Sequence, residues 1–178
     1  GGVGARANID ASDTITSSHA RYVAAKLRGA SVPGWNGDDI FVGFIHPDCD
    51  VDLREETGGK GWMEPANYNA PDRVWNGTIG RFAGIDWVST PRAAVLADAG
   101  ANSTVDVYLT LVVGAGALGK AYSEAEGGPQ AQFVLGPQVD RLRRHNTFGW
   151  YWLGGYGLLR EEAIWRIESA SSIGDNDA

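Results

Sequence analysis

The sequence has little of the side-chain chemistry on which most metal sites and many enzymes depend. Its 178 residues include one cysteine, three histidines and one methionine. The single cysteine, Cys49, excludes an internal disulfide and any cysteine-rich metal site. No apolar run reaches the roughly 20 residues that a membrane-spanning helix needs. The chain opens Gly1-Gly2 without Met or a visible signal peptide, so we expect a processed or partial chain.

Basic residues are also in short supply. The chain carries 15 Lys and Arg against 22 Asp and Glu, a formal net charge of -7 and a pI near 4.9. Such a surface repels polyanions on average, which argues against a protein that reads nucleic-acid sequence. The one basic cluster, RLRRH at 141–145, could touch phosphate. In an acidic chain we instead expect Arg143 and Arg144 to pair with acidic residues of another subunit.

Glycine and apolar residues are abundant, and their patterns predict an α+β protein. The chain has 25 glycines and is 43% apolar, which indicates one large globular domain or two small lobes with many turns. Ala20, Val23, Ala24 and Leu27 recur at helical spacing and predict a helix over 16–29. Apolar runs predict strands at 40–45, 85–90 and 105–113, with a short helix from Pro47 to Leu53.

The most distinctive stretch is an aromatic block at 147–168, which holds three of the seven tryptophans. Alternation predicts strands around 148–152 and 163–168, and Gly154-Gly155 between them indicates a turn, a bulge or a place where another backbone packs closely. Helix formers at 159–163 leave a helix open as the alternative there. The block offers no nucleophile with a base, so we interpret it as core.

Two other functions remain as alternatives. Gly114, Gly116 and Gly119 form a G-x-G-x-x-G after a strand, as in nucleotide-binding oxidoreductases, although no βαβ repeat surrounds them. Tryptophans in the first half of the chain could form the platform of a carbohydrate-binding module. These tryptophans are Trp62, Trp75 and Trp87.

A series of collinear motifs resembles the major capsid proteins of tailed phages, most closely the coliphage N-four-like capsid family. In the first half these motifs are FVGFIHPD (41–48), DLR (52–54), WNGTIGRFAG (75–84) and TPRA (90–93). In the second half they are VY (107–108), ALG (117–119), GPQVD (136–140), GWY (149–151) and LREEA (159–163). Each motif is weak alone, and their common order makes the resemblance specific.

The resemblance implies an α+β subunit of the Hong Kong 97 fold. Residues 1–15 would be a tether, 16–40 and 133–178 a peripheral domain, and 41–132 an axial domain. The helix at 16–29 would be the spine helix, and 114–119 a tight strand-to-helix turn. The Trp and Tyr side chains of the block at 147–168 would pack against the spine helix, with subunit contact as a further role. The family usually has an N-terminal arm and an extended two-stranded loop before the spine helix, and we expect these to lie upstream of Gly1.

The resemblance also implies a structural function without catalysis, cofactor or metal. Copies would assemble through pentamers and hexamers into an icosahedral virion shell around double-stranded DNA, without sequence-specific binding and without a membrane. Decoration, scaffolding and portal proteins are further candidate partners, and assembly would take place in the host cytoplasm. The residues that we expect at subunit interfaces are Trp62, Tyr68, Trp75, Arg143 and Arg144.

Overall fold

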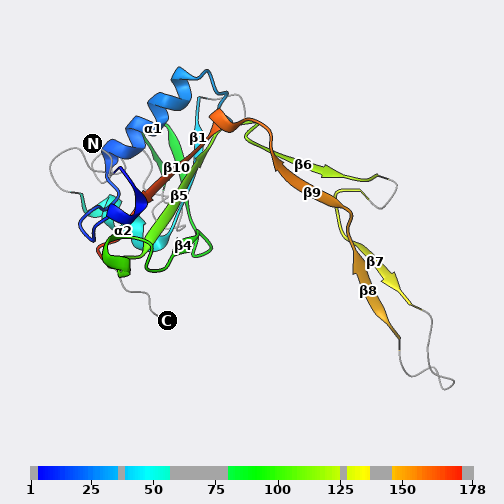
Figure 1. The fold of residues 1–178 in the computed structure, drawn as a ribbon. Coiled ribbons are helices and arrows are strands. Elements are labelled where there is room, and N and C mark those ends of the chain that lie inside the picture. The colour runs from blue at the N-terminus through cyan, green and yellow to red at the C-terminus, as the bar shows by residue number, and fades with distance from the viewer. Residues whose placement is uncertain (1–3, 36–38, 57–79, 125–127, 137–145, 174–178) are drawn as a thin grey trace. The chain divides into compact units, whose positions relative to one another are not determined.

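The computed structural model describes residues 4–35, 39–56, 80–124, 128–136 and 146–173 (Figure 1). Its contacts divide the chain into two compact units. Unit 1 comprises Gly1–Ala117 and Arg160–Ala178, and unit 2 comprises Leu118–Leu159. These boundaries differ from the expected division at 40/41 and 132/133. The division into contact units does not define which part of the subunit faces a symmetry axis of a shell. The assignment of peripheral and axial domains therefore stays a prediction.

Unit 1 is built on a six-stranded mixed sheet with the order β10-β5-β1-β3-β2, and β4 also pairs with β5. β1 and β3 run parallel, and the other pairings of this sheet are antiparallel. The strands are β1 (Phe41–Ile45), β2 (Gly80–Phe82), β3 (Ile85–Ser89), β4 (Val95–Leu96), β5 (Val107–Val113) and β10 (Ile164–Ser169). The strands expected at 40–45, 85–90 and 105–113 and the α+β class are therefore confirmed.

Two helices, α1 (Ser17–Gly29) and α2 (Pro47–Glu55), share one hydrophobic core with the sheet. At the start of α1 the Thr16 N–H donates to His19 Nδ1 at 3.2 Å. His46 caps α2 by accepting from the Asp48 N–H at 3.3 Å. The core side chains include Ala20, Val23, Ala24 and Leu27 of α1, Cys49 and Leu53 of α2, and Phe41, Ile45, Ile85, Trp87 and Val112 of the sheet. Neither described helix is long and apolar enough to cross a membrane.

A glycine on β1 makes room for the largest side chain of this core. Gly43 lies opposite Trp87 of β3 in the parallel register, and the indole is 2% exposed. A Cβ at position 43 would lie 2.7 Å from Trp87 Cε3 and 2.9 Å from Ile85 Cγ2. That is closer than real Cβ contacts come, so the absence of a side chain at Gly43 is a packing requirement.

The described residues of the expected tether, 4–15, pack on unit 1. Ile9 and Ile15 are buried, and the Ala170 N–H donates to the Asp13 carbonyl at 3.0 Å. Arg6 binds the Glu168 carboxylate through both Nε and Nη2, at 2.7 and 2.8 Å. The N-terminal segment is therefore attached along the end of β10.

The Arg6–Glu168 contact predicts a response to acid. The hydrogen bonds from Arg6 hold the pKa of Glu168 below its ordinary value of 4.5, with a further contribution from Arg166. Because the folded-state pKa of Glu168 is depressed, its carboxylate stabilises the attached segment at pH values above the ordinary pKa. This stabilisation is lost as the pH falls through the folded-state pKa. We expect Glu168→Gln to lower the hydrogen-exchange protection of the Ala170 amide at neutral pH and to remove its acid dependence.

The matched control for this prediction is Asp86→Asn, which breaks the exposed Arg81–Asp86 pair elsewhere in unit 1. It should leave the protection of the Ala170 amide unchanged at every pH. Equal acid dependence in the parent protein and in Glu168→Gln would show that Glu168 does not hold the segment.

The aromatic block is extended at its end, as predicted, but its glycines do not form a turn. β10 covers Ile164–Ser169, and a 3-10 helix, η5 (Glu161–Ala163), precedes it. Gly154 and Gly155 lie inside β9 (Gly154–Leu158), where they pair with Tyr122 and Ala121. The break between strands falls at Trp152 and Leu153 instead. A Cβ at Gly154 would lie 2.7 Å from the Ala121 carbonyl oxygen, so this glycine allows the two backbones to approach closely.

The glycine-rich segment after β5 leads into a strand, so the expected strand-to-helix turn is wrong. The chain turns at Gly116, whose φ is +76°, and continues as β6 (Leu118–Tyr122). Gly119 is part of β6 and pairs with Gly157. A dinucleotide site needs a helix N-terminus after these glycines to bind the pyrophosphate. The nucleotide-binding alternative therefore lacks its main structural element.

Candidate assembly surface

Unit 2 consists of two two-stranded antiparallel ladders. β6 pairs with β9, and β7 (Gln132–Leu135) pairs with β8 (Phe148–Tyr151). None of the residues that the structure describes in this unit is buried. Isolated two-stranded ladders are marginally stable in water and usually need a further layer on one face. Unit 2 therefore lacks, within its described residues, the core that would normally hold such strands.

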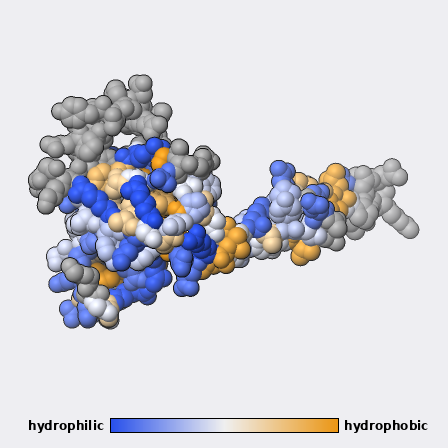
Figure 2. All heavy atoms as spheres, turned by 90° about the horizontal axis from the view of Figure 1, so that it is seen from above, coloured by the Kyte–Doolittle hydropathy of each residue, from blue (hydrophilic) through white to orange (hydrophobic). Residues whose placement is uncertain are grey.

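Large apolar side chains are concentrated on this unit. It contributes twelve of the seventeen exposed large hydrophobic residues described in the chain. Some of them appear as orange patches on the surface in Figure 2. The twelve are Leu118, Tyr122, Phe133, Val134, Leu135, Phe148, Trp150, Tyr151, Leu153, Tyr156, Leu158 and Leu159. Exposed apolar side chains in this number make unit 2 the candidate interaction surface among the described residues, since water solvates apolar area poorly.

The β7–β8 ladder has one aromatic face. Phe133 pairs with Trp150 and Leu135 with Phe148, so these four side chains share a face. All four are at least 64% exposed, and the rings of Phe133 and Phe148 stack with centroids 5.5 Å apart. The opposite face carries Gln132, Val134, Gly149 and Tyr151. We call the first set, Phe133, Leu135, Phe148 and Trp150, the aromatic face.

The β6–β9 ladder also has two different faces. On one, Lys120 lies over the rings of Trp152 and Tyr156 at 5.4 and 5.9 Å, and its Nζ donates to the Pro129 carbonyl at 2.8 Å. These cation–π contacts link Lys120 of β6 to Tyr156 of β9 and to Trp152, which precedes β9. The other face carries only Gly119, Ala121, Gly155 and Gly157 from the paired strands. The Leu159 side chain covers this face at Gly119, where a Cβ would lie 2.8 Å from Leu159 Cδ1, whereas the face is open at Gly155 and Gly157.

Sequence reasoning found the strands of this surface but not its exposure. Alternation predicted the strand at 148–152, and the aromatic block was interpreted as core. That interpretation is correct for Ala163, which is buried, and for Trp165, which packs edge-on against Tyr22 of α1 at 6.2 Å. It is wrong for β8 and β9. The alternation located the strand, but it does not tell whether the bulky side chains pack within the chain or remain exposed.

The residues predicted at subunit interfaces lie outside the described residues. Trp62, Tyr68 and Trp75 fall within 57–79, and Arg143 and Arg144 fall within 137–145. Their place at interfaces stays a prediction. Trp87 is different, because it is buried in the core of unit 1 and so cannot form part of a sugar-binding platform. The carbohydrate-binding alternative thereby loses one of its three tryptophans.

Among the described residues of unit 1, the two groups with the most reactive chemistry, Cys49 and His46, serve the packing of α2. Cys49 is buried beside Ser169, and burial raises the pKa of its thiol to about 12, so the reactive thiolate is scarce at neutral pH. His46 Nδ1 lies 3.2 Å from Asp48 Oδ2, and the Tyr108 hydroxyl donates to the same oxygen at 3.0 Å. This arrangement caps α2 and ties it to β5. In the part of the chain that is described, no three His, Cys, Asp or Glu side chains are grouped to hold a metal ion.

Three solved phage capsid structures share this fold. The capsid of Ralstonia phage GP4 is 19% identical, matches over 97% of this chain and 51% of that chain, and has a TM-score of 0.72. The capsid asymmetric unit of cyanophage Pam1 is 19% identical over 94% of this chain and 50% of that chain, with a TM-score of 0.68. The acidic stable capsid structure of Helicobacter pylori bacteriophage KHP30 is 11% identical over 93% and 63%, with a TM-score of 0.61. The chain spans about half the length of the first two structures.

A comparison of the sequence with protein families also identifies a phage capsid protein. No curated protein sequence matches the chain. The family model described as phage capsid protein matches residues 5–173, which is nearly the whole sequence. With the fold, this match confirms the resemblance to tailed-phage capsid proteins and the α+β fold of the Hong Kong 97 type. The chain belongs to the phage capsid protein family.

Proposed function

We propose that this protein forms the shell of a phage head, in which copies assemble through pentamers and hexamers into an icosahedral capsid around double-stranded DNA. Membership of the capsid family and the capsid fold support a structural role in the virion. The observation that most directly supports assembly is the aromatic face of β7–β8. Four large apolar side chains are exposed there on a ladder without a described core.

Assembly then follows from burial of this face between copies. Removal of apolar surface from water contributes roughly 25 cal/mol for each Å². A contact that is weak in one pair becomes strong when a closed shell repeats it many times. The role needs no catalysis and no cofactor, since the function is a property of surfaces. The predicted interface residues Trp62, Tyr68, Trp75, Arg143 and Arg144 belong to the same proposal.

The acidic net charge of the chain is compatible with a shell that encloses DNA. A formal net charge of -7 gives little attraction for the phosphate backbone, so DNA would be enclosed without sequence-specific binding. Decoration, scaffolding and portal proteins are the further partners of this proposal, and the host cytoplasm is the place of assembly. The peripheral and axial domains, with α1 as the spine helix, describe the expected position of each part in the shell.

Electron microscopy of the purified full-length protein tests the proposal. Regular shells, or flat sheets of hexamers, are the expected result at assembly concentrations. Analytical ultracentrifugation over a range of concentrations provides a second measurement, since a self-assembling subunit must show a concentration-dependent sedimentation profile. A monomer that keeps the same sedimentation coefficient at every concentration would contradict the proposal.

A further inference from the structure

The C-terminal end of α1 leaves one backbone carbonyl without a partner in the helix. The Val32 N–H donates to the Leu27 carbonyl at 3.1 Å. The Ser31 N–H donates to the Arg28 carbonyl at 2.9 Å, and the φ of Ser31 is +52°. These are the two hydrogen bonds and the left-handed residue of a Schellman motif. The carbonyl of Ala30 takes no part in this motif, so it can accept a donor from elsewhere in the chain.

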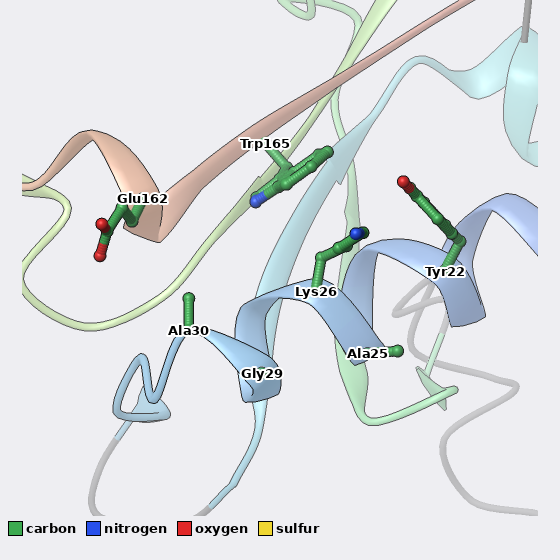
Figure 3. Close-up of a pocket in the computed structure, with 7 residues that line it drawn as sticks. All are labelled: Tyr22, Ala25, Lys26, Gly29, Ala30, Glu162 and Trp165. Atoms are coloured by element: carbon green, nitrogen blue, oxygen red, sulfur yellow. The ribbon is translucent and has the colours of Figure 1, made fainter.

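Arg160 supplies that donor. Its Nη2 donates to the Ala30 carbonyl at 2.9 Å in a partly buried position, and to the Glu162 carboxylate at 3.2 Å. Ala30 and Glu162 line the same groove between α1 and the start of β10 (Figure 3). A cation is favoured at the C-terminal end of a helix, because the macrodipole places partial negative charge there. Arg160, which belongs to the LREEA motif at 159–163, is therefore attached to the end of α1.

Arg160 is also the residue at which the chain returns from unit 2. Unit 2 begins after Ala117 and ends before Arg160, and the Arg160 N–H donates to the Ala117 carbonyl at 3.5 Å. The first pair of the β6–β9 ladder is Leu118 with Leu158. Contacts that fix Arg160 and Ala117 therefore also fix the base of this ladder, since its two strands begin next to these residues.

The outgoing chain is fixed at the same place. The Ala115 N–H donates to the Pro33 carbonyl at 2.9 Å, and the Gly114 N–H donates to the Ala163 carbonyl at 2.8 Å. A Cβ at Gly114 would overlap the Val32 side chain, which is buried. Three short segments of unit 1 thus form one joint at the end of α1. The segments of this joint are 30–33, 114–117 and 160–163.

We infer that Arg160 is a positioning residue for assembly, whose side chain fixes the joint and thereby holds the base of the β6–β9 ladder in one geometry before copies meet. This inference rests on the proposed shell function, because it gives Arg160 a role in presenting unit 2 as an assembly surface. A surface that is already held in its bound geometry loses less conformational freedom on association. Loss of the attachment should therefore weaken assembly although no residue of the aromatic face has changed.

Three substitutions separate this role from a general loss of stability. Arg160→Met keeps an unbranched side chain and removes every donor. Arg160→Lys keeps the positive charge and an N–H donor for the Ala30 carbonyl. Glu162→Gln removes only the ion pair with Arg160, at an exposed carboxylate, and is the matched control.

Hydrogen exchange of the free protein measures the attachment itself. Arg160→Met should speed the exchange of the Gly114 and Ala115 amides roughly tenfold, the change expected for one charge-assisted hydrogen bond. Arg160→Lys should restore most of this protection, and Glu162→Gln should keep all of it. The amides of β3 should exchange as in the parent protein in all three variants.

Three results of the exchange measurement would overturn the inference. The first is unchanged protection of Gly114 and Ala115 in Arg160→Met. The second is equal acceleration throughout unit 1, which would make Arg160 a residue of general stability. The third is an Arg160→Lys variant that restores nothing, because the donor to the Ala30 carbonyl would then not hold the joint.

Assembly provides the second readout, by light scattering and electron microscopy. Arg160→Met should need roughly tenfold more protein than the parent to form shells. Arg160→Lys and Glu162→Gln should form them near the parent's concentration. Faster exchange at the joint together with normal assembly of Arg160→Met would overturn the positioning role. A parent protein that forms no particles would instead contradict the proposed function, and the exchange measurement would still test the attachment by itself.

Discussion

Trp150→Ala is expected to abolish shell formation while the fold of unit 1 remains intact. Trp150 is the largest side chain of the aromatic face, is 68% exposed and pairs across the ladder with Phe133. Truncation of a tryptophan at the centre of an interface commonly costs about 2 kcal/mol or more for each contact, which is roughly a thirtyfold loss of affinity. A shell repeats the loss at every copy, so the concentration needed for assembly should rise beyond the usual working range.

The neighbouring residue provides the control. Tyr151 is an exposed aromatic on the same strand, but it projects from the opposite face beside Gln132. Tyr151→Ala should still form particles by electron microscopy and light scattering, and both variants should keep the thermal unfolding temperature of the parent. Equal assembly of the two variants would show that the aromatic face is not the contact surface. Loss of particles in both would assign the contact to the ladder as a whole.

The largest effect on stability is expected at Trp87. Its indole is buried in the core of unit 1, and Trp87→Ala leaves a cavity that should cost about 3–5 kcal/mol in the free energy of unfolding. Urea unfolding followed by circular dichroism measures this loss. The single cysteine provides a second probe, because Cys49 is buried and should react with a thiol reagent only when unit 1 opens.

The contact between Gly43 and Trp87 can be tested with a double-mutant cycle. Gly43→Ala places a Cβ 2.7 Å from the Trp87 ring and should destabilise unit 1 by about 1–3 kcal/mol through overpacking. In a Trp87→Leu background the ring is absent, and the same change at Gly43 should cost clearly less. If the two substitutions were simply additive, the contact between Gly43 and Trp87 would not be what excludes a side chain at position 43.

Unit 1 could be predicted well from the sequence because its patterns reflect one buried face. The helical spacing of Ala20, Val23, Ala24 and Leu27 located α1, and the apolar runs located β1, β3 and β5, since the core selects these positions. The pairing of strands could not be predicted in the same way. The parallel partnership of β1 and β3 joins residues more than forty positions apart, and no local pattern encodes it.

Unit 2 shows where local patterns lose their meaning. Trp150 and Tyr156 have the composition of a core, and hydrophobicity alone cannot distinguish a side chain that packs within its own chain from one that packs on another surface. Gly119 and Gly154 resembled turn residues because glycine suits both turns and close approach of backbones. The strands of the candidate assembly surface could therefore be predicted from the sequence, whereas the exposure of their side chains could be seen only in the structure.

The chain leaves unit 1 after β5 and returns to it before β10, and this arrangement allows the inserted segment to change in length and sequence. Unit 2 is inserted between β5 and β10, and the Arg160 N–H meets the Ala117 carbonyl at 3.5 Å where the chain returns. The pairing of β5 with β10 already closes this loop, and doubling the length of a flexible loop adds only about 0.6 kcal/mol of closure entropy. The inserted ladders can therefore lengthen, shorten or change sequence at little cost to the sheet. Contacts between copies can evolve on one segment while the fold is maintained by another.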